Sequence, residues 1–287
     1  MNIIIIDKKE PCIKTDNDTL VVDGQKVPFR LIDTIILIGK TKLTTNDINS
    51  LTSARISVIL LSYNYTNSTI ITTTKAKSPE LKLKQYQKAS TSPLQIAKKI
   101  ISLKISSHIE HLKSHQINLD KTPYLEKIED AKDLDTLLGI EGSFSKLYFG
   151  HYFDLFPKTL HKSKRSKRPP LDPLNAMLSY NYTLFYNLIS TRLLAHGFEL
   201  GIGFLHRPFR SHNALSSDIL ELLRADINEY VYTLFSQKII TQSDFSKKGG
   251  VYLRYEGRKK IWKNFREFLN KTEPKLDAYI TELKGML

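Results

Sequence analysis

Four side chains in the second half of the chain have the types and the spacing that could bind a divalent metal ion. Glu141 lies in LLGIEGSFSKLYF at the edge of an apolar helical stripe, where a carboxylate needs a partner because desolvating it alone is unfavourable by several kcal/mol. His206 lies in the apolar loop GIGFLHRPF, and Asp218 and Glu221 follow at positions i and i+3 of the next expected helix. One imidazole with two or three carboxylates suits Mg²⁺ or Mn²⁺, and the imidazole favours Mn²⁺. Such ions serve phosphodiester chemistry by holding a phosphate oxygen and activating an attacking hydroxyl or water.

Each of these residues also has a simpler interpretation. A lone Glu beside an apolar stripe is commonly a surface residue, and a lone His is commonly a hydrogen-bonding group of a core or loop. An acidic i,i+3 pair is common on a solvated helix face, and Arg224 could neutralise Glu221 three residues before it. Glu141 and the pair Asp218/Glu221 lie on different expected helices, so only tertiary packing can gather them. We expect the gathered carboxylates to repel one another unless a cation neutralises them.

The charge of the chain favours a polyanionic partner. Lys and Arg number 43 against 29 Asp and Glu, which gives a net charge of +14 and a pI near 9.6. Lys158–Arg168 contains six basic residues among eleven and no acidic residue, so it is either a solvated loop or a loop that contacts phosphates. A second basic region near the C-terminus is interleaved with aromatic residues, a mixture that suits strand backbones and bases. The residues expected to contact nucleic acid are Lys158, Lys162, Lys164, Arg165, Lys167, Arg168, Arg258, Lys259 and Lys260.

Length and composition exclude several classes of protein. With 287 residues the chain has room for about two domains. Its single cysteine, Cys12, excludes an internal disulfide framework and a Cys-based zinc cage and indicates a reducing compartment, so we expect a cytoplasmic protein. The longest apolar runs, Ile35–Ile38 and Val58–Leu61, have the length of strands and are far too short to span a membrane. The sequence contains no GxxxxGK[ST], GxGxxG or GxSxG motif.

The first part of the chain, up to about residue 75, has the amino-acid pattern of a β-rich domain. Asp23-Gly24 predicts a tight hairpin turn between Thr19–Val22 and Gln25–Phe29. One helix is expected between Ile38 and Ser57, where Thr44 or Thr45 can cap it, and the polar stretch Thr72–Ser78 is expected to be a linker. The other segments rich in Ile, Val and Thr are Asn2–Ile6, Thr34–Ile38, Ser57–Leu61 and Ser68–Thr73.

From about Pro79 the apolar residues repeat at helical spacing, and strand patterning is essentially absent. The expected helices are Pro93–His115, about Asp133 to Phe156, Asp172–His196, about Asn213 to Phe235, Arg258–Leu269 and Pro274–Met286. We therefore predict an α+β protein in which a β-rich, sandwich-like domain over residues 1–78 precedes a larger all-α domain over residues 79–287. The helical domain contains all of the candidate metal ligands and all of the basic residues named above.

The order of these blocks resembles the CRISPR-associated protein one family, the integrase and endonuclease of CRISPR adaptation. The resemblance covers nearly the whole chain, and it is specific in the helical part and only a matter of pattern in the β-rich part. The matching segments are KLKQYQ at 82–87, GIEGSFSKLYF at 139–149, RPPLDPLNAMLSYNYTLFYN at 168–187, GIGFLHRPFRSHNALSSDILELLR at 201–224 and GGVYLRYEGRKKIWKNF at 249–265. Leu223-Arg224-Ala225 stands where the family usually has Phe-Arg-Pro, and Ser216-Ser217 stands where bulkier residues are common, but neither departure removes a ligand.

The resemblance implies that Glu141, His206 and Glu221 hold the metal ion and that Asp218 orients the histidine or the metal waters. It implies an enzyme that inserts short DNA fragments as new spacers, with a 3′-hydroxyl attacking a phosphodiester at the leader–repeat junction. The implied partners are double-stranded DNA (the prespacer and the CRISPR leader–repeat) and the small ferredoxin-like CRISPR-associated protein two. The β-rich domain is expected to form a homodimer.

Two other functions are compatible with the same residues. One is a structure-selective DNA repair nuclease with the same metal site, which would cut DNA but would not join a free 3′-hydroxyl to a target. The other is a non-catalytic, basic nucleic-acid-binding protein, which would not bind manganese.

Overall fold

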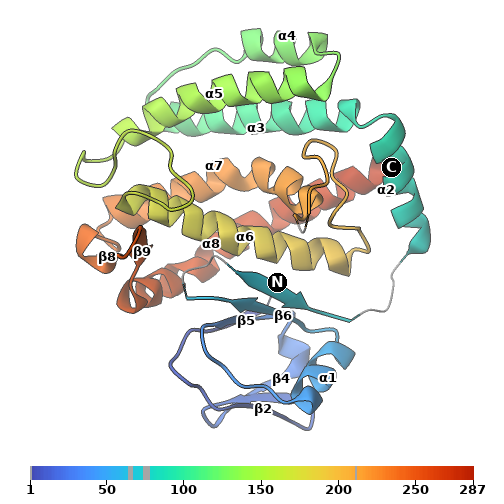
Figure 1. Cartoon of the computed structure of the whole chain (residues 1–287), viewed down its shortest axis with the longest axis vertical. Coiled ribbons are helices and arrows are strands. Elements are labelled where there is room, and N and C mark those ends of the chain that lie inside the picture. The colour runs from blue at the N-terminus through green and yellow to red at the C-terminus, as the bar shows by residue number, and fades with distance from the viewer. Residues whose placement is uncertain (1, 64–66, 74–77, 211) are drawn as a thin grey trace. The chain divides into compact units, whose positions relative to one another are not determined.

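The chain forms two compact units, residues 1–77 and 78–287, in the computed structural model (Figure 1). The structure describes residues 2–63, 67–73, 78–210 and 212–287. The expected linker Thr72–Ser78 lies largely outside the described residues. Every candidate metal ligand lies in the second unit.

The N-terminal unit contains two small sheets over a shared core. A mixed sheet has the strand order β1-β5-β6-β7, in which β1, β5 and β6 are parallel and β7 is antiparallel, and an antiparallel sheet has the order β2-β3-β4. Side chains from both sheets and from helix α1, including Leu20, Leu37 and Leu51, pack in one apolar cluster. The elements are β1 Ile3–Ile6, β2 Ile13–Asp16, β3 Thr19–Val22, β4 Gln25–Pro28, the 3₁₀ turn Phe29–Leu31, β5 Thr34–Ile38, α1 Thr45–Ser53, β6 Ser57–Leu61 and β7 Ser68–Ile71.

Local signals in the sequence explain the turn and the helix of this unit. Asp23 and Gly24 both have positive φ, at 49° and 83°, as a tight primed hairpin turn requires, and Val22 pairs with Gln25 across it. Thr44 caps α1 through a capping box with Asp47. Strand β2 was not predicted from the sequence, because only one of its residues is an apolar side chain buried in the core.

The second unit is a bundle of helices in which α3 lies between α5 and α7, and α7 in turn packs on α6 and α8 (Figure 1). Asp172 caps α6 by accepting a hydrogen bond from the backbone of Asn175, Pro173 occupies the first helical turn, and Gly197 with φ of 91° follows the end of α6. The helices are α2 Pro79–Thr91, α3 Leu94–Ser114, α4 Thr122–Asp130, α5 Leu134–Asp154, α6 Pro173–Ala195, α7 Ala214–Ser236 and α8 Tyr255–Gly285.

Three expectations for the helical part were wrong. Arg258–Leu269 and Pro274–Met286 belong to one helix, α8, because a continuous buried stripe that includes Phe265, Leu276 and Ile280 outweighs the break that Pro274 favours. Strands are also present, because β8 (Phe245–Lys247) and β9 (Val251–Leu253) form a hairpin preceded by the 3₁₀ turn Gln242–Asp244. Three residues are too few for alternation to be visible in a sequence. The helices α2 and α4 were missed.

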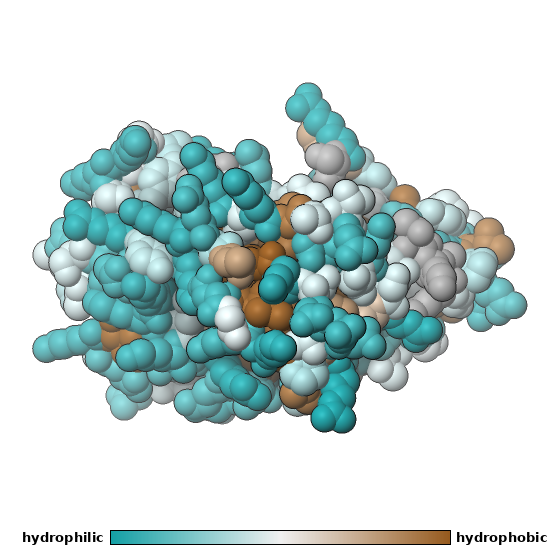
Figure 2. All heavy atoms as spheres, turned by 90° about the horizontal axis from the view of Figure 1, so that it is seen from below, coloured by the Kyte–Doolittle hydropathy of each residue, from teal (hydrophilic) through white to brown (hydrophobic). Residues whose placement is uncertain are grey.

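Within the part of the chain that the structure describes, no helix has the length and apolarity that crossing a membrane requires. On the face drawn in Figure 2, hydrophilic side chains dominate and the apolar side chains form only small patches.

Candidate active site

Glu141 of α5 and Glu221 of α7 meet at one lysine, Lys104 of α3. The Lys104 ammonium pairs with Oε1 of Glu141 and lies 2.5 Å from Oε2 of Glu221. Ser145, one turn after Glu141, donates a hydrogen bond of 2.6 Å to the same Oε1. Tertiary packing thus gathers two of the predicted acidic residues from helices about 80 residues apart in the sequence, and a positive charge of the chain itself lies between their carboxylates.

These charges are deeply enclosed. The side chain of Lys104 is 2% exposed and that of Glu221 is 5% exposed, whereas that of Glu141 is 23% exposed. The second oxygen of Glu221 lies 2.9 Å from the Arg224 guanidinium, so the simpler interpretation that Arg224 neutralises Glu221 is confirmed. Burial alone would raise the pKa of Glu221, but the charges of Arg224 and Lys104 outweigh it and lower this pKa to about 2. The expectation of unrelieved repulsion between the acids was therefore wrong, because two cations of the chain compensate them.

His206 is held by Asp218, which is fully buried. The Asp218 carboxylate accepts hydrogen bonds from the backbone N–H groups of Phe204 (2.6 Å), Leu205 (3.0 Å) and His206 (2.9 Å), and from Nδ1 of His206 at 2.8 Å. Because a carboxylate only accepts, Nδ1 carries the ring proton and Nε2 keeps a free lone pair while the ring is neutral. Burial alone would lower the pKa of His206, but the hydrogen bond and charge of Asp218 outweigh it and raise this pKa.

Gly203 makes this arrangement possible. A Cβ atom at this position would lie 2.8 Å from Oδ2 of Asp218 and 2.9 Å from the carbonyl oxygen of His206. Both contacts are closer than ordinary packing allows, so the loop can wrap around the carboxylate only if residue 203 has no side chain. Gly203 of the GIGFLHRPF segment thus allows the loop to fold around Asp218.

The three expected ligand atoms do not converge on one point. His206 and Glu221 are close enough to shift each other's pKa, but they and Glu141 are not a group whose ligand atoms all lie within 4.8 Å of one another. Among the described residues, the group that satisfies this distance is His111, His115 and Glu229.

Sequence reasoning missed two side chains beside the candidate ligands. Lys104 interrupts the apolar stripe of Ala97, Ile101 and Ile105 on α3, and a lysine in such a stripe is a signal of a buried charge that needs acidic partners. The ring of His212 lies 6.1 Å from that of His206, and its Nε2 contacts the hydroxyl of Ser217 at 3.1 Å. No spacing rule distinguishes a loop histidine such as His212 from a solvated one.

Two of the expected DNA-contacting residues are enclosed by the fold. Arg165 hydrogen bonds to Asn175 and Ser179 of α6 and lies over the ring of Tyr182. Arg258 is 5% exposed. Both differ from the expectation of free basic side chains, because a guanidinium can fill a polar gap inside a helical bundle when enough acceptors surround it.

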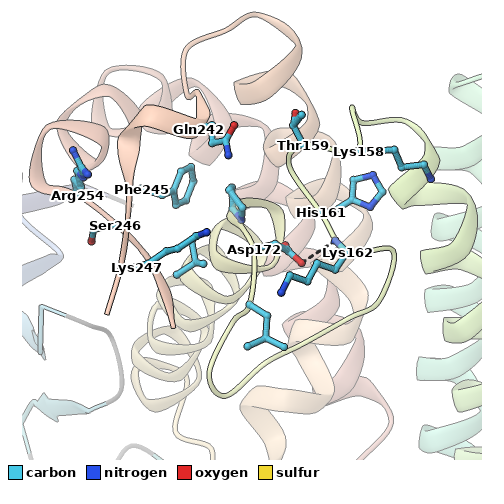
Figure 3. Close-up of a pocket in the computed structure, with 13 residues that line it drawn as sticks. Lys158, Thr159, His161, Lys162, Asp172, Gln242, Phe245, Ser246, Lys247 and Arg254 are labelled. Carbon is cyan, nitrogen blue, oxygen red and sulfur yellow. Dashed lines mark hydrogen bonds between the residues drawn. The ribbon is translucent and has the colours of Figure 1, made fainter. Parts of the chain in front are cut away.

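The remaining basic side chains reach the surface and come from two distant parts of the sequence. Lys158 and Lys162 of the 157–172 loop line a cavity of about 490 Å³ together with Lys247 and Arg254. In Figure 3, the side chains of Lys162 and Lys247 extend toward one another. Lys162, Lys164, Lys167 and Arg168 are exposed, whereas Lys158, Lys259 and Lys260 pair with Asp154, Glu256 and Asp244. Lys167 reaches solvent, but the protein atoms around it partly desolvate its ammonium and lower its pKa. The nearby charges of Arg224 and Arg165 also lower this pKa, while Glu221 and Glu141 act in the opposite direction. The basic loop therefore extends to the border of the acidic site.

Comparison with known proteins connects this geometry to one family. The family model described as CRISPR associated protein Cas1 matches residues 4–267. A curated endonuclease of Thermodesulfovibrio yellowstonii, CRISPR-associated endonuclease Cas1 1, is 31% identical, and the match covers 94% of this chain and 92% of that protein.

Solved structures show the same fold. A Cas1 protein from Thermotoga maritima superposes with a TM-score of 0.91 at 22% identity, covering 99% of this chain and 96% of that chain. A casposase bound to integration product has a TM-score of 0.83 at 25% identity, with 94% of this chain and 83% of that chain covered. A partial Cas6-RT-Cas1–Cas2 complex has a TM-score of 0.66 at 25% identity, with coverage of 99% and 94%.

Proposed function

The chain belongs to the CRISPR-associated Cas1 family, and from this membership we propose how its own residues carry out the integrase and endonuclease activity of CRISPR adaptation. We place the reaction at Glu141, His206 and Glu221. The observation that carries this assignment is the pair of carboxylates facing one positive charge, with an aspartate-held histidine near Glu221. The casposase similarity supports strand transfer, and nothing in the comparisons favours a repair nuclease or a non-catalytic binding protein.

The donor types of these residues fit a divalent metal ion, which would draw together ligand atoms that do not all lie within 4.8 Å of one another in the structure. The Lys104 ammonium marks a point to which oxygen atoms of Glu141 and Glu221 both turn, and His206 offers a free Nε2. Two carboxylates and one imidazole suit Mn²⁺ and accept Mg²⁺. When bound, the ion supplies positive charge that stabilises the phosphodiester transition state. Glu141 is more exposed than Glu221, at 23% against 5%, and is therefore the carboxylate freer to turn away from Lys104.

Asp218 acts as a positioning residue in this proposal. Both of its oxygens are occupied by hydrogen bonds from the loop, and one of those bonds fixes the His206 ring with Nε2 facing away from the carboxylate. Such a partner sets the tautomer and orientation of a ligating histidine. In strand transfer, the 3′-hydroxyl oxygen of the incoming fragment bonds to phosphorus while the bond from phosphorus to the 3′-oxygen of the target strand breaks.

The exposed basic residues are proposed to hold the DNA backbone without reading its sequence. Lys162, Lys164, Lys167 and Arg168 are the exposed basic members of the loop, and Lys158 and Lys259 exchange weak surface pairs for phosphates. Lys260 would leave its pair with the buried Asp244 to do the same. Arg165 and Arg258 support this surface from beneath.

Three further parts of the proposal concern partners and location. The Cas6-RT-Cas1–Cas2 similarity supports an assembly with CRISPR-associated protein two, and the similarity to a casposase bound to integration product supports binding of DNA. The N-terminal unit is proposed to form the homodimer, because its sheets end in edge strands such as β1 and β7 and Leu31 is exposed. The free cysteine Cys12 fits a reducing cytoplasm.

Separating catalysis from DNA binding tests the site assignment. Glu141→Gln, His206→Asn and Glu221→Gln should each abolish DNA cleavage and strand transfer in Mn²⁺ while DNA affinity stays near wild type. The matched control is Glu126→Gln, an exposed glutamate on α4 that should leave all three measurements unchanged. Wild-type strand transfer in the three variants would overturn the assignment. An enzyme that cuts DNA but never joins a 3′-hydroxyl would point to a repair nuclease instead.

A further inference from the structure

A second group of potential metal ligands lies where α3 meets α7, away from Glu141 and His206. His111 lies in the last turn of α3, His115 is the cap residue directly after the helix, and Glu229 faces them from α7. One potential ligand atom from each residue lies within 4.8 Å of the other two. Nε2 of His115 is 2.7 Å and Nε2 of His111 is 3.1 Å from the same oxygen, Oε2 of Glu229.

This cluster is separate from the proposed active site. Glu229 follows Glu221 by eight residues on α7, so their backbones are about 12 Å apart along the helix. On α3, His111 follows Lys104 by seven residues, which is about 10 Å. The cluster therefore shares two helices with the active site but none of its candidate ligands.

His111 has the features of an oriented ligand. It is 7% exposed, and its Nδ1 lies 3.0 Å from the hydroxyl of Tyr148, which also accepts a hydrogen bond of 2.9 Å from Asn228. Its Nε2 is buried and has no hydrogen-bond partner among the described residues, because the approach to Glu229 has poor geometry. A buried ring nitrogen without a hydrogen bond is uncommon in folded proteins, and here it is directed toward a carboxylate.

The other two residues open the cluster to solvent. The side chain of His115 is 13% exposed and that of Glu229 is 45% exposed. An ion can therefore enter from the Glu229 side, and a water molecule can reach it there. The ring of His115 also packs edge-on against the ring of Tyr232, at 4.4 Å between centroids, and this contact restricts the orientation of the second imidazole.

We propose that His111, His115 and Glu229 bind a Zn²⁺ ion, with water as the fourth ligand, and that this ion ties α3 to α7. Two imidazoles at i and i+4 of a helix with one carboxylate form a donor set typical of zinc, whereas Mg²⁺ prefers oxygen ligands. Ligand atoms around a tetrahedral zinc ion lie about 3.3 Å apart, so the observed 2.7 and 3.1 Å need only a small outward shift. In the structure both rings approach one oxygen of Glu229; with the ion bound, both rings and this oxygen contact the ion instead.

Zinc stoichiometry of the full-length protein tests this inference. After chelator treatment and dialysis against Zn²⁺, the His206→Asn variant, which lacks one proposed catalytic ligand, should retain one tightly bound equivalent. The double variants His206→Asn/His115→Asn and His206→Asn/Glu229→Gln should lose it. The matched control adds His151→Asn, a half-buried histidine of α5 outside the cluster, which should keep the equivalent. Co²⁺ bound to His206→Asn should give the intense visible absorption of a four-coordinate site, and this signal should vanish in the two cluster variants.

The outcomes separate this inference from the proposed function. If the cluster variants bind as much Zn²⁺ as the His151 control, or if His206→Asn binds none, the inference is overturned. Because Glu229→Gln is isosteric at a half-exposed position, its melting curve without metal serves to show that lost binding is not lost folding. Strand transfer in Mn²⁺ by the single variant His115→Asn reports on the proposed active site independently of the zinc result.

Discussion

Lys104, His108 and His111 lie on the buried side of α3, and His115 follows at its C-terminal cap. The two ends of this polar seam satisfy their charges in different ways. At one end, Lys104 is buried between Glu141 and Glu221, and Arg224 completes the charge balance. At the other end, two histidines share the half-exposed Glu229. The first end places permanent charges inside the bundle and needs the cations of the chain to stay folded. The second end contains two imidazoles that can be neutral, so the fold tolerates the loss of one of its three residues.

The difference indicates which end of the seam contributes more to the stability of the fold. Removing one partner of a buried ion pair leaves an uncompensated charge, whereas an exposed pair contributes little. His108 lies between the two ends, fully buried and with Nδ1 2.7 Å from the carbonyl oxygen of Lys104. Along the seam, the charge of Lys104 is needed for folding, His108 is a neutral imidazole, and the cluster at Glu229 is not needed for folding. Each of these positions can be tested separately.

The largest effect is expected from Lys104→Met, which keeps the shape of the side chain and removes its charge. Two carboxylates would then face each other with Arg224 as the remaining cation near them, so unfolding free energy should fall by about 3–5 kcal/mol in EDTA. Mn²⁺ should recover more of the melting temperature in this variant than in the wild type, because no ammonium then competes for the carboxylates.

The control for this variant is Lys99→Met on the same helix. Lys99 pairs with Glu282 at the surface, so its loss should change stability by less than about 1 kcal/mol. Equal stability of the Lys104 and Lys99 variants would show that the acids do not depend on Lys104.

A pH dependence of similar size is expected at the centre of the seam. Burial and the charge of Lys104 lower the pKa of His108 to about 3, below its ordinary value of 6.5. The unfolded chain therefore binds a proton before the folded one, and the stability falls as the pH drops from 6.5 toward 3, by up to about 5 kcal/mol. His108→Leu should flatten this part of the stability curve in urea titrations. Parallel curves for wild type and variant would contradict the burial of a neutral imidazole.

A smaller effect is expected from Asp218→Asn. The amide presents N–H groups to backbone donors, so the stability should fall by about 1–3 kcal/mol. Strand transfer should fall by about 10–100-fold rather than vanish, because the ring of His206 is misoriented but still present. Asp226→Asn, two turns further along α7 and paired with Lys275, is the matched control that should leave strand transfer unchanged. Complete loss in Asp218→Asn would make Asp218 a direct ligand.

What the sequence predicted well are features decided by a few neighbouring residues. The turn at Asp23-Gly24 and the cap Thr44 depend on local hydrogen bonds and on backbone angles, and they were found at the expected places. The helix boundary at Pro274 was wrong because packing of a long apolar stripe outweighed a local preference.

The seam was not predictable in the same way. Lys104 and His111 lie on the same helix as the apolar stripe, and only the approach of α5 and α7 decides that their face is buried. Periodicity finds the apolar face of a helix but cannot tell which polar residues beside it will be covered. The resemblance to a known family supplied Glu141 and His206, but it gave no indication of the lysine between the acids.

The smallest effect in the absence of metal is expected from Glu229→Gln. Burial alone would raise the pKa of Glu229, but the close approach of the His111 and His115 rings to this carboxylate outweighs it and lowers this pKa. Because the carboxylate is half-exposed, these contacts should contribute less than about 1 kcal/mol, and the variant should unfold almost like wild type in EDTA at pH 7. With free Zn²⁺ at 100 times its dissociation constant, the wild type should gain about 2.7 kcal/mol, and the variant should gain much less. A large loss in EDTA would mean that this end is as obligatory as the Lys104 end. An equal gain from Zn²⁺ in both proteins would mean that the ion binds elsewhere.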